Sequence, residues 1–244
     1  MSEKLEIQKK VFLGTVPVRL IVEKFDIPLF FNVPRGSNIG IFVYSVLSEE
    51  IGESCEDLWF SLNGYPIKWQ YPIGVIYDSI IKPSGQFQPI TIQVNRSKFP
   101  SGPIIRCSSA AIASHYFCHS FKESTFLVEG SLSILQQNIG LHSAIERSVL
   151  SRNFEEFSDL TSKKGPYEDW KKWPIRVYDS NKNQCLNCFL SIEPGQTIKT
   201  ALMERGFSEK DNVICQGISL STELQLSEIV HQLINPDGFI YFIV

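Results

Sequence analysis

The feature that most constrains the fold is the segment from residue 58 to residue 74, LWFSLNGYPIKWQYPIG. It places the dipeptide Asn63-Gly64 between two apolar runs. This dipeptide is the strongest short-range signal for a β-hairpin, because both central residues of a type I′ turn need positive φ. Two tryptophans and two tyrosines in the same segment supply a heavy apolar load for a small core. The segment therefore predicts a short hairpin with an aromatic-Pro-Ile-Gly exit.

The first hundred residues predict the order strand, strand, helix, strand, short strand, last strand, which is the order of a ubiquitin-like β-grasp fold. β-Branched and aromatic residues favour the early strands, and apolar residues at imperfect helical spacing follow them. An alternating segment after the hairpin predicts the last strand. The expected elements are strands at 11–22 and 28–33, a helix at 40–51, the hairpin, and a strand at 89–94.

The last third of the chain predicts the same order again. The expected elements are a hairpin from 173–178 and 186–192, a helix at 198–205 closed by Gly206, a strand at 212–218, a helix at 223–233 and a strand at 239–244.

Two local echoes indicate a duplicated unit. Pro17-Val18-Arg19-Leu20 returns as Pro174-Ile175-Arg176-Val177, and the strand reaching Gly64 returns as the strand reaching Gly217. The offset is about 155 residues in both cases, and similarity at a fixed offset is the usual mark of a repeated unit. The alternative is that any two β-hairpins have this much sequence similarity.

The middle of the chain predicts helices. Residues 108–121 space Ala110, Ala113, Phe117 and Phe121 for one face, and 131–137 and 143–157 have helix-compatible composition. Residues 162–166, SKKGP, are the most linker-like stretch. We therefore predict an α+β chain with two ubiquitin-like β-grasp domains, at 8–100 and 170–244, flanking a helix-rich domain at 105–165.

Composition excludes several classes of function. The chain of 244 residues is 43% hydrophobic and 20% charged, as in globular proteins, and its net charge of −3 gives no reason to expect nucleic-acid binding. The N-terminus lacks an apolar signal core, and no apolar run approaches the length of a membrane span. Six cysteines are too few for a disulfide scaffold, which favours a cytoplasmic location.

The polar motifs predict neither catalysis nor a metal or cofactor. Cys185-x-x-Cys188 has no second Cys or His pair at a suitable spacing and lies beside a predicted strand. His115 and His119 form half of a metal site on the predicted helix, with Glu123 continuing the spacing at the helix end. Cys118-His119 are neighbours that point about 100° apart on a helix, so they make poor contact. Phosphate-binding glycine loops and hydrolase motifs are missing from the sequence.

The hairpin segment also resembles a known family. Its Trp-Phe…Gly…Pro-Ile-Lys-Trp-x-Tyr-Pro-Ile-Gly pattern is similar to autophagy-related protein 5, and so is the C-terminal stretch from Val213-Ile214 to Asp237-Gly238-Phe239. The resemblance covers nearly the whole chain, with a loosely matched middle. It implies two ubiquitin-like folds flanking a helical domain in a scaffold that is not itself catalytic. The scaffold is joined covalently to the ubiquitin-like modifier autophagy-related protein 12.

The resemblance implies an acceptor lysine and a helical partner. Phe117-Cys118-His119-Ser120-Phe121-Lys122-Glu123 is similar to the family's acceptor site, with Lys122 as the acceptor at the end of the first helix. Lys122 is the only lysine between residues 99 and 162. Pro34-Arg35 matches a Pro-Arg of the family, in which an amphipathic helix of autophagy-related protein 16 binds a groove formed by all domains. Arginine suits bidentate pairing with an acidic helix. The alternatives are that Lys122 is an ordinary solvated surface lysine and that Arg35 is an ordinary arginine in a turn.

A membrane contact is the last expectation. The densest basic cluster could attract anionic headgroups, at about 1 kcal/mol per basic residue, although solvated charge is the alternative. Its members are Lys163, Lys164, Lys171, Lys172 and Arg176.

The chain ends Tyr241-Phe242-Ile243-Val244, without the terminal glycine that an activated modifier needs. We therefore expect a conjugated scaffold. In a ligase-like complex with autophagy-related protein 16 and a lipid-conjugating enzyme, it would promote lipidation of autophagy-related protein 8 at the growing autophagosome membrane. The alternative is a non-covalent adaptor that binds partner helices or peptides.

Overall fold

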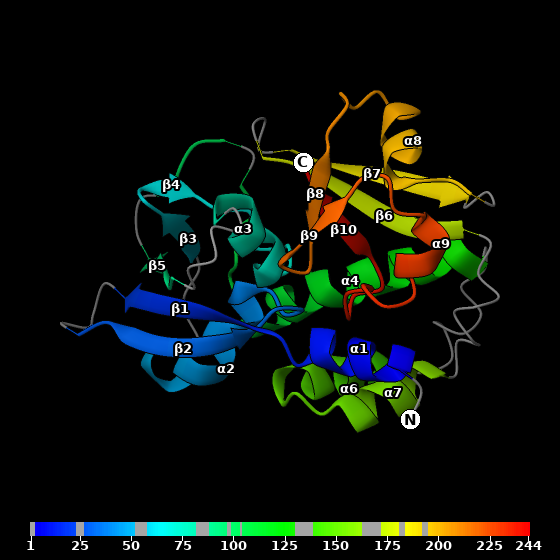
Figure 1. The fold of residues 1–244 in the computed structure, drawn as a ribbon. Coiled ribbons are helices and arrows are strands. Elements are labelled where there is room, and N and C mark those ends of the chain that lie inside the picture. Colours follow the sequence, from blue (N-terminus) through cyan, green and yellow to red (C-terminus); the bar gives the residue numbers. More distant parts are fainter. Residues whose placement is uncertain are drawn as a thin grey trace.

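The computed structural model describes residues 3–22, 27–51, 58–81, 88–96, 99–102, 104–129, 139–162, 172–180, 184–191 and 195–244. Within these ranges two five-stranded sheets stand beside a layer of helices (Figure 1). The elements of the first half are α1 (Glu3–Phe12), β1 (Thr15–Val22), β2 (Leu29–Pro34), α2 (Ile39–Ile51), β3 (Trp59–Leu62), β4 (Tyr65–Pro66), α3 (Ile73–Ile80), β5 (Ile90–Asn95) and α4 (Ala110–Glu129). Those of the second half are α6 (Ile139–Leu150), α7 (Phe154–Ser162), β6 (Lys172–Asp179), β7 (Gln184–Ser191), α8 (Ile198–Met203), β8 (Asn212–Cys215), β9 (Ile218–Ser221), α9 (Leu226–Ile229) and β10 (Ile240–Ile243).

The first sheet has the strand order β2-β1-β5-β3-β4. β1 is antiparallel to β2 and parallel to β5, with Val18 opposite Ile90. Burial alternates along β1, as expected for a strand with one face on a core, and α2 contributes Ile39 and Val43 to that core. We call β1 to β5 with α2 and α3 the first β-grasp unit.

The second sheet repeats this plan with the order β7-β6-β10-β8-β9. β6 is antiparallel to β7 and parallel to β10, with Ile175 opposite Ile240, so the Pro17 and Pro174 echoes occupy equivalent strands. We call β6 to β10 with α8 and α9 the second β-grasp unit. The predicted duplication and the α+β fold of two ubiquitin-like units are confirmed, whereas the domain boundaries at 100, 105, 165 and 170 stay predictions.

Both units turn their short hairpins in the same way. Asn63 and Gly64 have φ of 51° and 81°, and Gln216 and Gly217 have φ of 53° and 77°. Positive φ at both central residues confirms the predicted Asn-Gly turn. The single strand predicted at 212–218 is wrong, because Gln216-Gly217 divides it into β8 and β9.

The helices differ from the prediction in several places, among them the segment 143–157, which is divided between α6 and α7, and the helix expected at 223–233, which is the shorter α9. The strand predicted to begin at Val11 begins at Thr15, because α1 precedes it, with acidic residues in its first turn and basic residues in its last. α3 was not predicted. α4 continues past Phe121 to Glu129; within it the hydroxyl of Thr125 donates to the carbonyl of Phe121, and that of Ser124 shares its one proton between this carbonyl and the carbonyl of Asp237.

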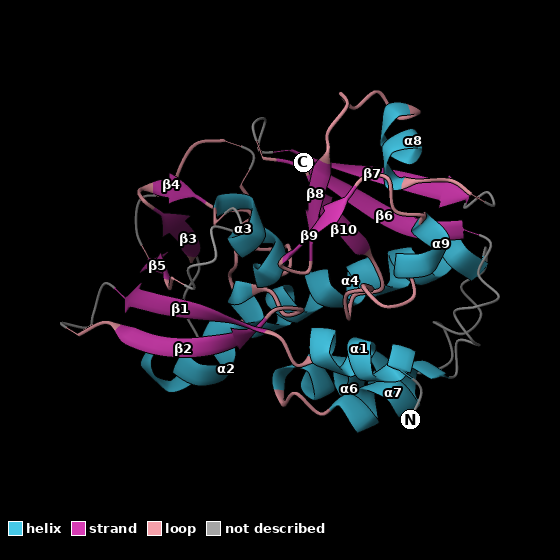
Figure 2. Ribbon diagram, viewed as in Figure 1, coloured by secondary structure: helices cyan, strands magenta, loops and turns pink. Residues whose placement is uncertain are grey.

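The helical layer consists of α1, α4, α6 and α7 (Figure 2). α4 runs beneath the second sheet, while α1 lies against α7 through the rings of Phe12, Phe154 and Phe157. The aromatic exit of the hairpin joins the first unit to this layer. Trp69 is fully buried, its Nε1 donates to the carbonyl of Ile105 at 2.6 Å, and its ring meets Tyr116 of α4 edge-on.

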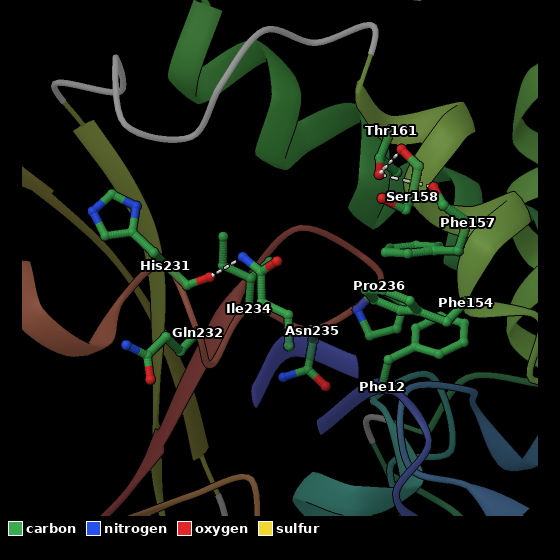
Figure 3. A pocket seen from close by; sticks show the side chains of 11 residues that line it. Phe12, Phe154, Phe157, Ser158, Thr161, His231, Gln232, Ile234, Asn235 and Pro236 are labelled. Atoms are coloured by element: carbon green, nitrogen blue, oxygen red, sulfur yellow. Dashed lines mark hydrogen bonds between the residues drawn. The ribbon is translucent and has the colours of Figure 1, made fainter. Parts of the chain in front are cut away.

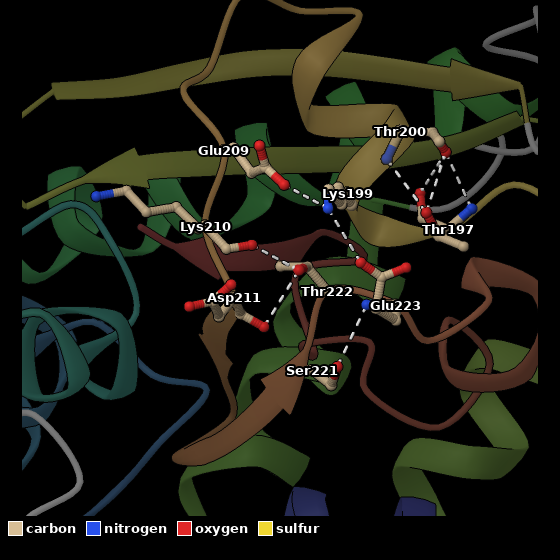
Figure 4. Close-up of polar contacts among 9 residues, drawn as sticks. All are labelled: Thr197, Lys199, Thr200, Glu209, Lys210, Asp211, Ser221, Thr222 and Glu223. Atoms are coloured by element: carbon tan, nitrogen blue, oxygen red, sulfur yellow. Dashed lines mark hydrogen bonds and ion pairs between the residues drawn. The ribbon is translucent and has the colours of Figure 1, made fainter.

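Short-range polar contacts shape the outer part of the second unit (Figure 4). The side chains of Thr197 and Thr200 form a reciprocal capping box at the start of α8. Lys199 contacts the carboxylates of Glu209 and Glu223. Both pairs are solvated and contribute little to stability, so this cluster is a local brace with no sign of a ligand.

Several predicted segments fall on residues that the structure does not describe. The linker-like residues 163–166 and the helix-compatible segment 131–137 lie outside the described ranges. Cys185 and Cys188 occupy β7, opposite Tyr178 and Ile175, and only their backbone is described.

Candidate functional site

The outward face of α4 carries the predicted acceptor, Lys122. Residues three or four positions apart are exposed on this side, as expected for a helix whose other sides pack against protein. They are Ala111, Ile112, His115, His119, Lys122 and Phe126. Lys122 makes no hydrogen bond or ion pair with the described part of the chain. The expected helix end is wrong, because Lys122 lies about two turns before Glu129, yet its side chain is exposed.

The groups beside Lys122 do not form a nucleophilic centre. Cys118 lies one turn before Lys122 and is half-buried, and burial together with the nearby Glu146 carboxylate raises the pKa of its thiol. Burial also raises the pKa of Cys107 to about 12 and that of Cys215. A thiolate nucleophile needs the opposite environment, with a lowered pKa and partial exposure.

The half metal site predicted on α4 stays incomplete. The rings of His115 and His119 are 5.9 Å apart, but the carboxylate of Glu123 turns away and accepts from Arg176 at 2.8 Å. Among the described residues, no three His, Cys, Asp or Glu side chains come together as metal ligands.

The inward face of α4 is bound to the second β-grasp unit through Arg176. The guanidinium donates to Glu123 at 2.8 Å, to the hydroxyl of Tyr241 at 2.9 Å and to Ser120 at 3.2 Å. It also lies 3.5 Å from the ring centre of Phe239. Arg176 therefore binds α4 to the second β-grasp unit on the side of the helix opposite Lys122.

A second contact strengthens the same junction. The hydroxyl of Ser124 on α4 donates to the carbonyl of Asp237 at 2.8 Å. Gly238 follows with φ of +83°, and a Cβ there would lie 2.2 Å from the hydroxyl oxygen of Ser124. Glycine is thus required for the close approach of the Ser124 side chain to this turn.

The predicted membrane patch loses one member. Arg176 is 6% exposed and ion-paired, so its inclusion in a surface patch is wrong; three partners remote in sequence bury it. Lys163, Lys164 and Lys171 lie outside the described residues, and the side chain of Lys172 is not described. In the described ranges, no helix combines the length and apolar character that a bilayer crossing requires.

Arg35, the residue predicted to bind the partner helix, lies inside the molecule. Its side chain is 10% exposed and pairs with the carboxylate of Asp78 on α3, which is 4% exposed. Its Nη2 also donates to the carbonyl of Gly74 at 3.4 Å. A direct contact between Arg35 and a partner helix stays a prediction.

An apolar hollow lies where three parts of the chain meet (Figure 3). α1, α7 and the loop after α9 line it, chiefly through Phe12, Phe154, Phe157, Thr161, Ile234 and Pro236. The side chain of Gln8 on α1 donates to the carbonyl of His231 at 2.7 Å and spans one end. A volume of about 60 Å³ is far below that of a small-molecule pocket and suits an apolar side chain of a protein partner.

Sequence reasoning did not find the residues of this hollow or the partners of the two buried arginines. Phe154 and Phe157 are spaced for one helix face, which is a usable signal, but their facing residues lie far away in the sequence. Asp78 and Asp237 carry no local signal, because the arginines they pair with, Arg35 and Arg176, lie far away in the sequence.

Comparisons with known proteins agree with this architecture. Residues 11–96 match the family model described as "Autophagy protein ATG5, UblA domain", and residues 166–244 match "Autophagy protein ATG5, UblB domain", together more than half of the chain. The chain is 24% identical to autophagy protein 5 of Drosophila melanogaster, covering 100% of this chain and 98% of the relative. It is also 24% identical to autophagy-related protein 5 of Kluyveromyces marxianus, with 98% of both chains covered. The crystal structure of Kluyveromyces marxianus Atg5 superposes with a TM-score of 0.83 over 98% of each chain.

Proposed function

The chain belongs to the autophagy protein 5 family and its role lies in autophagy, and we propose that Lys122 is the residue to which autophagy-related protein 12 is covalently joined. The conjugate, with autophagy-related protein 16, acts as a ligase-like complex that promotes lipidation of autophagy-related protein 8. It works as a peripheral protein at the forming autophagosome membrane.

The exposed position of Lys122 on α4 carries the proposal. An isopeptide bond forms when a free amine attacks the carbonyl of an activated C-terminal glycine and the thiol of the conjugating enzyme leaves. The acceptor therefore has to supply an accessible lysine. Lys122 meets this requirement, since it is exposed, unpaired within the described chain and without a competing lysine between residues 99 and 162.

Among the described side chains, Lys122 supplies the amine, and the cysteines are poorly suited to react. The three cysteines whose side chains are described are half-buried or buried, with raised thiol pKa values. In the proposed function, separate enzymes activate the modifier and this protein acts as a scaffold.

The apolar hollow beside Phe12 is the proposed seat of the partner helix. Amphipathic helices bind by placing apolar anchors, spaced three or four residues apart, into a hydrophobic groove. The hollow is lined by aromatic rings of α1 and α7 and by Pro236, with polar Gln8 and Asn235 at its border. A helix seated there contacts the helical layer and the second β-grasp unit together.

The membrane contact is the basic cluster's part in the proposal. It now rests on the lysines at 163, 164, 171 and 172, whose side chains the structure does not describe. Each lysine near an anionic surface contributes about 1 kcal/mol at low salt.

A reconstituted conjugation reaction tests the acceptor assignment. The protein is incubated with the modifier and its activating and conjugating enzymes, and the product is measured as a gain of one modifier mass. We expect Lys122→Arg to abolish the product, while the matched control Lys210→Arg, at another exposed lysine, leaves its yield unchanged. Conjugation of the Lys122→Arg protein at normal yield would refute the assignment.

The same assay separates the non-covalent adaptor. If the unaltered protein binds the partner helix but forms no conjugate under conditions in which a reference acceptor reacts, the adaptor function is correct. The hollow alone would then account for its interactions.

A further inference from the structure

The carboxylate of Asp78 binds both β-grasp units at once. Asp78 belongs to α3 of the first unit, where it pairs with the guanidinium of Arg35. Its Oδ2 also accepts the backbone N–H of Gly217, in the β8–β9 turn of the second unit, at 2.7 Å. The side chains of Arg35 and Asp78 are buried, where an unpaired charge is costly, whereas Gly217 is exposed and turns its N–H toward Asp78.

The second unit is shaped to approach this pair closely. Gly217 has φ of +77°, and a Cβ built there would lie 3.3 Å from Nη1 of Arg35 and 3.4 Å from its Cζ. The turn thus lies directly against the guanidinium. A methyl group at this position would press on Arg35, which would have to shift by a few tenths of an ångström.

The contact continues from Arg35 to the apolar hollow. Gly36, the next residue in the chain, lies so close to Pro236 that a Cβ would fall 2.4 Å from its Cγ. Pro236 is one of the residues that line the hollow. Asp78, Arg35, Gly217 and the Gly36–Pro236 contact therefore form one continuous seam between the units.

We propose that Asp78 and Arg35 form an interdomain clasp that fixes the second β-grasp unit relative to the first and so holds the hollow open at the width that a partner helix needs. Arg35 is then a positioning residue that acts through Asp78, and it does not touch the partner. That a partner helix occupies the hollow rests on the proposed function, whereas the clasp is argued from the contacts between the two units alone.

Burial and charge favour this role over direct contact. Nη2 of Arg35 is occupied by Asp78 and by the carbonyl of Gly74, and its buried Nε has no hydrogen-bond partner within the described part of the chain. A partner carboxylate that reached Arg35 would also approach the Asp78 carboxylate in a low-dielectric site, where like charges repel strongly. The clasp instead contributes by raising the population of the binding-competent arrangement. If that population falls to about one tenth, the apparent affinity falls about tenfold.

A matched pair of glycine variants tests the clasp from the second unit. Gly217→Ala places a methyl group against Arg35, while Gly64→Ala changes the equivalent turn of the first unit, with φ of +81° and no atom within 4 Å of the added Cβ. Both variants carry the same backbone strain. Spin labels on p-acetylphenylalanine at positions 30 and 203, both exposed, away from the two substituted turns and one in each unit, report the distance between the units. We expect a broadened or displaced distance distribution for Gly217→Ala and an unchanged one for Gly64→Ala.

A double-mutant cycle then decides how Arg35 acts. A labelled peptide of the autophagy-related protein 16 helix is titrated against Arg35→Ala, Asp78→Ala and the double variant. We expect each single variant to lose about tenfold in affinity, and Arg35→Ala to cause no further loss once Asp78 is gone. Asp78→Asn keeps an acceptor for the Gly217 N–H and is expected to lie between the wild type and Asp78→Ala, which gives a readout if the alanine variant fails to fold.

Two results would overturn the clasp. One is a distance distribution identical for the wild type, Gly217→Ala and Asp78→Asn. The other is an equal loss from Arg35→Ala with and without Asp78, which would mean direct contact with the peptide. If the wild-type protein does not bind the peptide, the proposed partner is wrong, and the distance measurement still decides the clasp.

Discussion

Replacing Arg176 by Met removes the charge that joins α4 to the second β-grasp unit while keeping a side chain of similar length. The guanidinium is the counterion of Glu123 and Asp237, at 2.8 and 4.0 Å, and it donates to Tyr241. Met fills the space of the aliphatic stem, so the change removes the charge and its hydrogen bonds with little loss of packing.

The expected cost follows from the two carboxylates left behind. Removing one partner of a buried ion pair typically costs about 3–5 kcal/mol, because the remaining charge stays uncompensated. Asp237 is 2% exposed and cannot regain solvent without opening the junction. We therefore expect Arg176→Met to lower the free energy of unfolding by about 3–5 kcal/mol, and Asp237→Asn in the same chain to restore a large part of it.

Urea denaturation followed by tryptophan fluorescence measures this loss. Arg19 is the equivalent residue of the first unit, half-buried and without a charged partner among the described contacts, so Arg19→Met is the matched control. We expect that control to cost less than about 1 kcal/mol. Equal losses for the two variants, or a loss below about 1 kcal/mol for Arg176→Met, would refute the idea that the arginine holds the junction.

Three further changes test other parts of the structure. Burial raises the pKa of Glu146 above its ordinary 4.5, against the opposing hydrogen bond from Ser114. As the pH rises through the folded-state pKa of Glu146, its ionisation lowers the stability of the folded protein. We therefore expect Glu146→Gln to have a higher melting temperature than the wild type at pH 7, with a difference that fades toward pH 4. A difference that does not depend on pH would contradict this. Gly238→Ala should lower the free energy of unfolding by about 2–5 kcal/mol, from left-handed strain and the clash with Ser124. Gly206→Ala, with φ of +80° and open space around it, should lose only the strain contribution. Equal losses would count against the close approach at Gly238. Trp69→Ala should cost about 3–5 kcal/mol, because the ring is fully buried; an unchanged melting temperature with lost partner binding would assign the ring to a binding surface instead.

The sequence predicted best what local preferences decide. Asn63-Gly64 adopts the predicted turn because these two residues tolerate positive φ better than any others, and no distant contact is needed. The repeated strand order follows from alternation and from the echoes around Pro17 and Pro174, which occupy equivalent strands. The extension of α4 was missed because Ser124 and Thr125 favour turns unless their hydroxyls bond within the helix, as they do here.

The sequence did not show which charged residues would be buried or which groups they would pair with. Arg19 and Arg176 share the same strand position in the two units, yet only Arg176 is buried among Glu123, Tyr241 and Asp237. Arg35 likewise follows a strand like many surface arginines. Its burial depends on Asp78 and on the arrival of the second unit, which no local pattern encodes.

The most direct test of the central claim is peptide mapping by mass spectrometry of the protein isolated from its native cells. The account predicts a branched peptide in which the C-terminal glycine of the modifier is joined to the Nζ of Lys122. The same branch on another lysine, or a modifier-free protein from cells with active autophagy, would contradict it.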